Sequence, residues 1–232
     1  MEKITPPNSF LPSQALQALA TGHLILVAVS KKQPDSKIID ALKAGYTHFG
    51  ENTLQGLTRT AKLLQDFPNT RMHFVGRLQS NKIKKICSLS PAIIHSVAQQ
   101  THMETFVRLQ QEGIQIPQLL LQINCAQNQD QEGLTPELEP ILDALNQFSS
   151  LPFVGLMTMG GAPDRYPRRS EWLQVTHLAF AKLTEIRREL QHRGFKHICH
   201  LSMGMSEDYE IALQEGATLL RLGTLIFGPR PL

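Results

Sequence analysis

The stretch LILVAV, residues 24–29, is apolar at every position and decides the fold. A strand with one face in water alternates apolar and polar side chains, whereas a parallel strand covered by helices on both faces is apolar throughout. The stretch is also far shorter than the roughly 20 apolar residues that span a membrane. It therefore predicts a buried parallel strand in a protein that combines strands with helices.

Seven further strand-like runs follow it along the chain. They cover residues 46–50, 71–75, 92–95, 119–124, 153–157, 197–201 and 218–222. Helical segments separate them, including 36–44, which Gly45 ends, and 103–109 and 178–190, where apolar residues recur every three or four positions. Eight strands, most of them followed by a helix, in 232 residues predict a (β/α)8 barrel that forms a single domain over residues 1–232.

The two ends of the chain complement each other in this prediction. Only residues 223–232 follow the eighth strand, and they are too few for a closing helix of ordinary length. We expect a helix around residues 10–21 to pack on the barrel and to cover that side. A doubly wound open sheet is the alternative, but no Gly-x-Gly-x-x-Gly turn follows the first strand to support a dinucleotide site.

Composition and charge exclude several classes of protein. With 41% hydrophobic and 19% charged residues, the chain is neither disordered, collagen-like nor a coiled coil. The net charge of +3 is small, and no aromatic platform accompanies the basic runs at 81–85 and 165–169, so we expect no nucleic-acid partner. Cys87, Cys125 and Cys199 form no CxxC pattern, so we expect free thiols and no bound metal. The N-terminus has no secretory signal, and we expect a cytoplasmic protein without a membrane partner.

Barrels of this type place their chemistry at the carboxyl ends of the strands. Lys31 follows the first strand, where desolvation favours the neutral form of an amine, and a neutral amine can attack an aldehyde to form a Schiff base. A surface lysine at the start of a loop is the alternative, since Lys32 follows at once. Neighbouring residues of a strand face opposite ways, so at most one of the two points inward.

Small, hydroxyl-bearing loops follow the last two predicted strands. Ser206 precedes two acidic residues and is expected to cap the helix that begins there. Gly223 and Thr224 follow the eighth strand, a place where barrels often bind phosphate. The two loops together predict a phosphate site, with plain helix capping as the alternative for Ser206.

Arg221 lies in the last apolar run, between leucines. A charge in a buried strand needs a partner. One candidate is a carboxylate such as Glu51, which would give Arg221 a structural role. The other is an acceptor on a bound ligand, and the residues alone leave both open.

Five segments of the chain resemble the pyridoxal phosphate homeostasis protein family in the same order. They read AVSK (28–31), HFGEN (48–52), HFVGRLQSNK (73–82), LSMGMS (201–206) and RLGTLIFG (221–228). The similarity runs from about residue 10 to residue 230. It implies the fold of the alanine racemase N-terminal domain, a (β/α)8 barrel. In alanine racemase a C-terminal β-domain of the partner subunit supplies a catalytic tyrosine, and we expect this chain to lack that domain because so few residues follow Thr224.

The resemblance also implies a site for pyridoxal 5′-phosphate. The residues that it assigns to the cofactor are Lys31, Asn52, Ser202, Ser206, Arg221, Gly223 and Thr224. Lys31 is expected to carry the cofactor as a Schiff base, and Arg221 to donate to the pyridine nitrogen. Asn52 is expected near the ring, and the loops after the last two strands around the phosphate, with Ser202 nearby.

The function that the resemblance implies is binding, buffering and delivery of pyridoxal 5′-phosphate, with apo-enzymes that use this cofactor as partners. A permanently charged arginine at the pyridine nitrogen keeps that nitrogen unprotonated and weakens the ring as an electron sink, so we expect no turnover. A small racemase-like enzyme that uses the same cofactor is the alternative. The resemblance favours a monomer.

Two loops depart from the pattern or extend it. Many bacterial relatives carry a lysine before the glycine of the loop after strand five, where this chain has Gln131, so a transfer role for that lysine is in question here. The stretch APDRYP, residues 162–167, resembles a mobile loop over the barrel mouth. Docking of a recipient enzyme and a plain insertion are both open interpretations of it.

Overall fold

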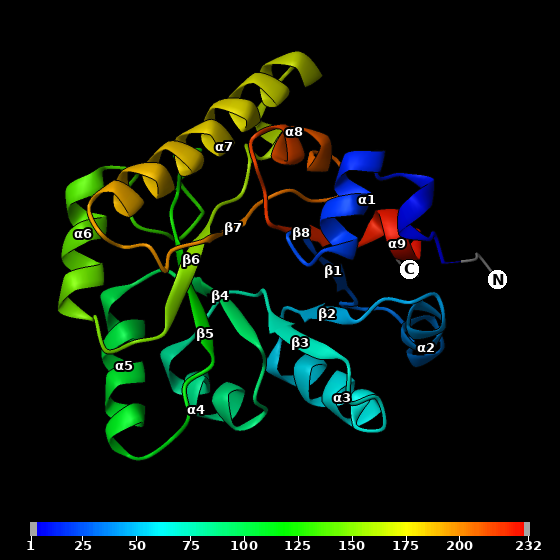
Figure 1. Cartoon of the computed structure of the whole chain (residues 1–232), viewed down its shortest axis with the longest axis horizontal. Coiled ribbons are helices and arrows are strands. Elements are labelled where there is room, and N and C mark those ends of the chain that lie inside the picture. Colours follow the sequence, from blue (N-terminus) through cyan, green and yellow to red (C-terminus); the bar gives the residue numbers. More distant parts are fainter. Residues whose placement is uncertain (1–3, 230–232) are drawn as a thin grey trace.

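The computed structural model describes residues 4–229, and in this part of the chain eight parallel strands close into a barrel (Figure 1). The strands are β1 (Ile25–Val29), β2 (His48–Glu51), β3 (Arg71–Phe74), β4 (Ile93–Val97), β5 (Gln118–Gln122), β6 (Phe153–Met157), β7 (His200–Ser202) and β8 (Leu219–Leu222). Each strand pairs with the next, and β8 pairs with β1. This closure confirms the predicted barrel and excludes the open sheet.

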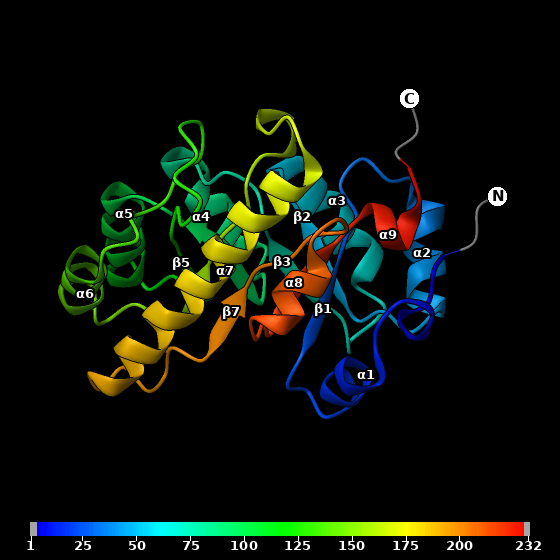
Figure 2. The same ribbon diagram turned by 90° about the horizontal axis from the view of Figure 1, so that it is seen from above.

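Helices lie on the outside of the barrel, most of them between two strands (Figures 1 and 2). They are α1 (Ser13–Ala20), α2 (Asp35–Lys43), α3 (Leu54–Leu64), α4 (Ser80–Ser88), α5 (Gln100–Gln111), α6 (Leu138–Gln147), α7 (Arg169–His192), α8 (Tyr209–Gln214) and α9 (Thr224–Phe227), with 3-10 turns η1 (Pro7–Ser9) and η2 (Pro163–Arg165). No helix within residues 4–229 combines the length and the apolar character that a membrane crossing requires. Cys87, Cys125 and Cys199 are free cysteines.

Each of the eight predicted strands lies within two residues of its observed position except β7. The prediction was residues 197–201, whereas the strand runs from His200 to Ser202. Ile198 is fully buried, yet it lies in the turn before the strand, where its backbone N–H bonds the carbonyl of Phe195. The apolar character before β7 therefore reflects a buried loop rather than the strand itself.

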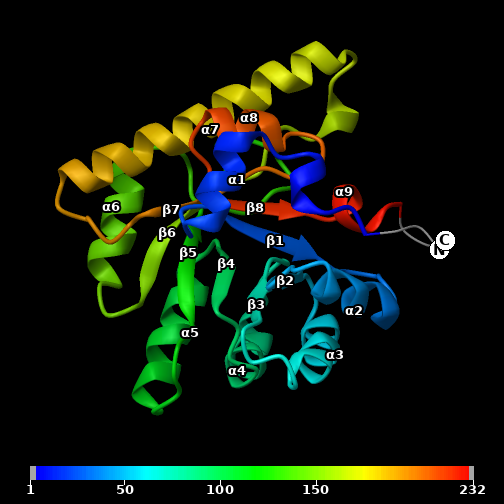
Figure 3. The same ribbon diagram turned by 45° about the vertical axis from the view of Figure 1, so that its right-hand side comes forward.

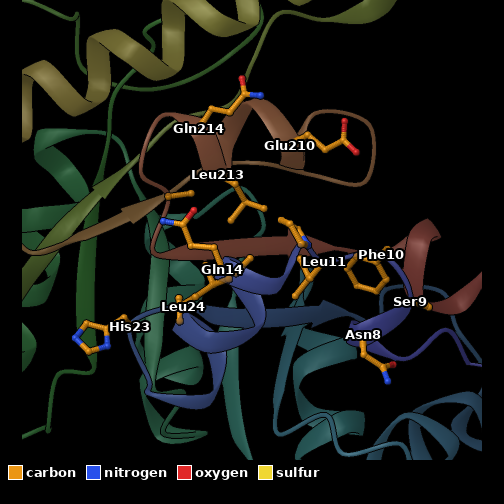
Figure 4. A pocket seen from close by; sticks show the side chains of 14 residues that line it. Asn8, Ser9, Phe10, Leu11, Gln14, His23, Leu24, Glu210, Leu213 and Gln214 are labelled. Atoms are coloured by element: carbon orange, nitrogen blue, oxygen red, sulfur yellow. The ribbon is translucent and has the colours of Figure 1, made fainter.

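The N-terminal segment packs beside α8, and its helix lies within the expected residues 10–21. It consists of the turn η1 and the helix α1, with Leu11 and Ala15 buried in the main core. The Tyr209 hydroxyl at the start of α8 bonds the carbonyl of Phe10 at 3.2 Å. Side chains of both helices, including Leu213, line one groove (Figure 4). After β8 only the single turn α9 follows within the described chain (Figure 3); residues 1–3 and 230–232 of the predicted domain lie outside it.

Inside the barrel, three imidazoles bind one another in a row. His48 Nδ1 lies 2.8 Å from His73 Nε2, and His73 Nδ1 lies 2.9 Å from His95 Nε2. His95 Nδ1 in turn lies 2.8 Å from the hydroxyl of Ser202. His48 begins β2 and Ser202 ends β7, so this histidine chain of His48, His73 and His95 leads from the amino end of the barrel to its carboxyl end.

Burial keeps the inner members of the histidine chain neutral. Loss of solvation lowers the pKa of His73 to about 3, with the neighbouring His48 and His200 adding to the effect. The pKa of His95 is held well below its ordinary value by the same burial, together with His73 and Arg221. An imidazole whose folded-state pKa lies below its unfolded value takes up a proton only on unfolding, so acid destabilises the fold.

We predict that acidification from pH 6.5 to pH 5 lowers the free energy of unfolding through His73 alone by about 2 kcal/mol, since the unfolded state gains a proton that the folded state refuses. Denaturant titrations at a series of pH values measure this dependence. The variant His73→Leu should lose that part of the slope. In Leu121→Ala, a cavity variant of the barrel wall, stability should fall equally at every pH. An unchanged slope in His73→Leu would contradict the assignment.

Candidate functional site

A pocket of about 320 Å³ lies at the carboxyl ends of the strands. Its lining includes six of the seven predicted site residues: Lys31, Asn52, Ser206, Arg221, Gly223 and Thr224. Ser202 does not line it but contacts Arg221 from below. The groove between α1 and α8 is larger, about 650 Å³, but it lies on the outer surface and holds none of these residues (Figure 4). We therefore take the smaller pocket as the candidate site.

The turn after β1 aims one lysine into the pocket. The backbone N–H of Gln33 bonds the carbonyl of Ser30 at 3.0 Å and closes a tight turn around the two lysines. Lys31 is half-buried and lines the pocket, whereas Lys32 is exposed in a left-handed conformation with φ 60°. The structure thus brings in one lysine of the pair, as the alternation of a strand predicts.

Glu51 does not pair with Arg221, which corrects one of the two interpretations of that arginine. The Glu51 carboxylate is buried at the end of β2, where its Oε1 accepts the hydroxyls of Ser30 at 2.7 Å and Thr60 at 2.9 Å. It joins the end of β1 to α3 and so fixes the loop that carries Asn52.

Asn52 is held from the other side by the end of β3. A Cβ atom added to Gly76 would lie 1.9 Å from the carbonyl oxygen of Asn52 and 2.7 Å from its Cα. Only a glycine allows the two backbones to approach this closely. The glycine of the segment HFVG is therefore required by the position of Asn52.

Ser206 joins the loops after β7 and β8. Its hydroxyl oxygen accepts the backbone N–H groups of Gly223 at 3.3 Å and Leu225 at 3.1 Å. The prediction that Ser206 caps a helix is wrong, because α8 begins later with Asp208 at the N-cap position. Tertiary contact between the two loops has taken the place of local capping, and it gathers backbone donors and a hydroxyl at one wall of the pocket.

Arg221 is a buried cation without an ion pair among the described residues. It is 7% exposed and donates from Nη1 to the Ser202 hydroxyl at 2.6 Å and from Nη2 to the Thr158 carbonyl at 3.1 Å. Burial lowers its pKa to about 10, against the opposing charge of Asp208. The guanidinium stays protonated at neutral pH and retains N–H donors beyond the two in use. A buried charge of this kind favours an acceptor on a ligand.

The loop after β6 covers the pocket and is anchored to α7. Trp172 Nε1 donates to the Gly161 carbonyl at 2.7 Å, and the Gly161 N–H donates to the Thr176 hydroxyl at 3.1 Å. Trp172 and Pro163 line the pocket. The mobility expected for residues 162–167 stays a prediction. Analysis of the sequence missed Trp172, since a lone tryptophan in a helix gives no signal for a ligand site.

Gln131 stands outside the pocket lining. Its side-chain oxygen accepts from Asn128 Nδ2 at 2.8 Å, and its backbone carbonyl accepts from Asn124 Nδ2 at 3.1 Å.

Gln33, by contrast, is buried and lines the pocket, and its side-chain Oε1 has no hydrogen-bond partner within residues 4–229. Sequence analysis did not select Gln33, because an amide next to two lysines has the pattern of an ordinary loop.

Known proteins resemble the chain along nearly its whole length. The family model "Alanine racemase, N-terminal domain" matches residues 14–231. The pyridoxal phosphate homeostasis protein of Synechocystis sp. is 34% identical over 228 residues, which cover 95% of this chain and 99% of that protein. That of Schizosaccharomyces pombe is 32% identical over 224 residues, covering 94% and 90%. The chain belongs to the pyridoxal phosphate homeostasis protein family.

Solved structures agree with the family. PipY of Synechococcus elongatus with pyridoxal phosphate bound is 33% identical, with a TM-score of 0.76 over 95% of this chain and 96% of that one. Alanine racemase from Bacillus anthracis is 15% identical with a TM-score of 0.68, and the match covers 97% of this chain and 54% of the racemase. The second likeness shows the fold alone: the chain corresponds to the barrel portion of the racemase.

We predict that Gly76→Ala lowers stability by about 1–3 kcal/mol and displaces Asn52, since the new methyl group collides with backbone atoms. Gly223→Ala is the matched control, because its Cβ meets only Val29 atoms at 3.4 Å and beyond, an ordinary contact. Thermal denaturation of both variants measures the difference. Equal stability of the two would mean that the β2 and β3 loops separate easily, against the argument for Asn52.

Proposed function

We propose that this member of the pyridoxal phosphate homeostasis protein family binds pyridoxal 5′-phosphate in the pocket at the carboxyl ends of the strands, and that it buffers and delivers the cofactor in the cell. The observation that carries the proposal is the convergence of Lys31, Arg221 and the Ser206 loop on one pocket. The names of its relatives and the ligand of PipY support it.

The residues of the pocket fit each part of this cofactor. When bound, pyridoxal 5′-phosphate supplies an aldehyde, which condenses with an amine with loss of one water. Lys31 offers the amine. The hydroxyls of Ser206 and Thr224 offer donors to a phosphate, and the N–H groups of Gly223 and Leu225, which Ser206 Oγ accepts, orient the Ser206 hydroxyl. Arg221, which has no ion pair within residues 4–229, offers an N–H to the ring nitrogen.

The state of Arg221 favours holding the cofactor over amino-acid turnover. Its pKa of about 10 leaves it cationic at neutral pH, so it donates a hydrogen bond but resists giving up a proton. A ring nitrogen that accepts from such a donor stays unprotonated, and the ring withdraws electrons poorly from an attached amino acid. The racemase-like alternative has to work with this weaker electron sink.

We also propose partners, a compartment and an oligomeric state for the protein. Its partners are the cofactor and apo-enzymes that receive it. We propose that it acts in the cytoplasm, where thiols such as the exposed Cys199 stay reduced, and as a monomer. Light scattering of the purified protein over a range of concentrations tests the monomer.

We predict that the protein incubated with pyridoxal 5′-phosphate turns yellow, and that borohydride reduction followed by peptide mass mapping places the adduct on Lys31. Lys31→Ala should stay colourless because it lacks the amine. Lys32→Gln is the control, since Lys32 is exposed and outside the pocket lining, and it should keep both colour and adduct. A wild-type protein that cannot be charged with the cofactor would overturn the proposed function.

We further predict that the loaded protein does not exchange the Cα proton of alanine with deuterium oxide at an enzymatic rate. Proton NMR of the amino acid follows the exchange. Typical enzymes turn over at about 1–1000 per second, and a rate in that range would favour the racemase-like alternative.

A further inference from the structure

We propose that His95 and His73 are positioning residues for Arg221: through Ser202 they form a hydrogen-bonded chain of fixed direction that holds the guanidinium in place beneath the pocket. The role of Arg221 toward the cofactor rests on the proposed function above. The direction of the hydrogen bonds in the chain follows from the protein's own side chains and does not depend on a bound cofactor. The three imidazoles bind one another in a row, and no group of three side chains within residues 4–229 is arranged to hold a metal ion.

Arg221 sets the donor-to-acceptor direction of the hydrogen bonds, because a guanidinium can only donate. Ser202 Oγ therefore accepts from Arg221 Nη1 at 2.6 Å. The hydroxyl has one proton of its own, and the Ser202 side chain is fully buried. The acceptor that the described residues offer to that proton is His95 Nδ1, at 2.8 Å. Ser202 thus accepts from the arginine and donates to the histidine.

The hydrogen bond from Ser202 also fixes the direction of the two hydrogen bonds between the imidazoles. A neutral histidine has one donor and one acceptor nitrogen. Since His95 Nδ1 accepts, its Nε2 carries the proton and donates to His73 Nδ1, and His73 Nε2 donates in turn to His48 Nδ1. The reverse direction would make Ser202 accept twice and leave its own buried proton unpaired, which costs free energy. The chain therefore has one favoured set of tautomers.

Burial is the largest cause of the lowered pKa of each imidazole, and the charges around the chain act in the same direction. Arg221 faces His95 from β8, His200 faces both inner histidines from β7, and Arg71 on β3 faces His48. Asp208 faces Arg221 at the upper end. Among the described residues, the titratable groups that face the imidazoles are basic, and the acid Asp208 lies beyond the arginine. Protonation of His73 or His95 is disfavoured, so the chain acts as a constant support for Arg221 and not as a switch near neutral pH.

The support works through the proton of Ser202. While His95 accepts that proton, the Ser202 lone pairs face Arg221 and fix Nη1, and the Thr158 carbonyl fixes Nη2. Without the acceptor, the hydroxyl has to turn toward another partner. Arg221 then loses a fixed contact, and its remaining donors no longer face the pocket in one orientation.

Binding of pyridoxal 5′-phosphate to three variants tests the role. We expect His95→Leu to bind about 10-fold more weakly, the loss of one oriented hydrogen bond. His95→Asn keeps an acceptor oxygen near the place of Nδ1 and should stay within about 2-fold of the wild type. His200→Asn is the matched control: His200 is a barrel histidine outside the chain that contacts Thr218, and its replacement should also leave affinity within about 2-fold. Equal affinity of His95→Leu and the wild type would overturn the positioning role.

Imidazole nitrogen NMR of the ligand-free protein tests the direction without the cofactor. We expect neutral His95 and His73 with the proton on Nε2 from pH 6 to pH 8. In Ser202→Ala, His95 should lose its single tautomer, because its Nδ1 has lost the donor that fixes it. A proton on His95 Nδ1, or a charged inner imidazole at pH 6, would overturn the proposal. A wild type that shows the expected tautomers but cannot bind pyridoxal 5′-phosphate would contradict the proposed function and leave the chain's direction intact.

Discussion

The pairing of β8 with β1 sets the geometry on which the candidate site depends. In this register Arg221 stands opposite Val27 and Leu222 stands opposite Ala28. Lys31 follows β1 and Gly223 follows β8, so both leave the barrel at the same rim. A slip of one residue would turn the alternate side chains of β8 around, moving Arg221 toward the helices and Leu220 into the barrel. The register is therefore fixed by packing, and the packing also places the chemistry.

The buried cation Arg221 requires polar groups around it inside the closed barrel. Arg221 loses most of its hydration, and no carboxylate within the described chain replaces it with an ion pair. A carbonyl, a hydroxyl and the histidine chain behind that hydroxyl stabilise it instead. Neutral acceptors do not compensate the positive charge of Arg221, so the charge still acts on the pocket. A side-chain carboxylate in an ion pair with Arg221 would cancel it. This is the arrangement of a ligand site rather than of a structural ion pair.

The sequence predicted what depends on local pattern. Eight apolar runs separated by helical segments predicted the barrel. The residues that follow the first and last strands predicted that Lys31 and the Gly223–Thr224 loop line the site. One prediction was wrong and one open alternative is excluded, and both concern contacts between distant segments. The hydroxyl of Ser206 bonds a loop about 17 residues away instead of capping its own helix, and Glu51 bonds two hydroxyls instead of Arg221. Local propensity cannot foresee either choice, because the competing partners lie in loops and helices that are distant in the sequence or belong to another element.

The histidine chain shows the same limit more sharply. His73 and His95 each take an inward position on their strands, as does Leu219 on β8, but inward alternation does not say which inward residues meet. That depends on the stagger of the strands, and β4 and β5 shift their register within this barrel. A barrel with the same fold but other side chains on these inward positions would hold its arginine differently. The shared fold with alanine racemase, at 15% identity, therefore carries no argument about activity. What this chain does with a ligand follows from the few polar groups that its register brings into an otherwise apolar interior, of Ile93, Leu120, Met157 and Leu219.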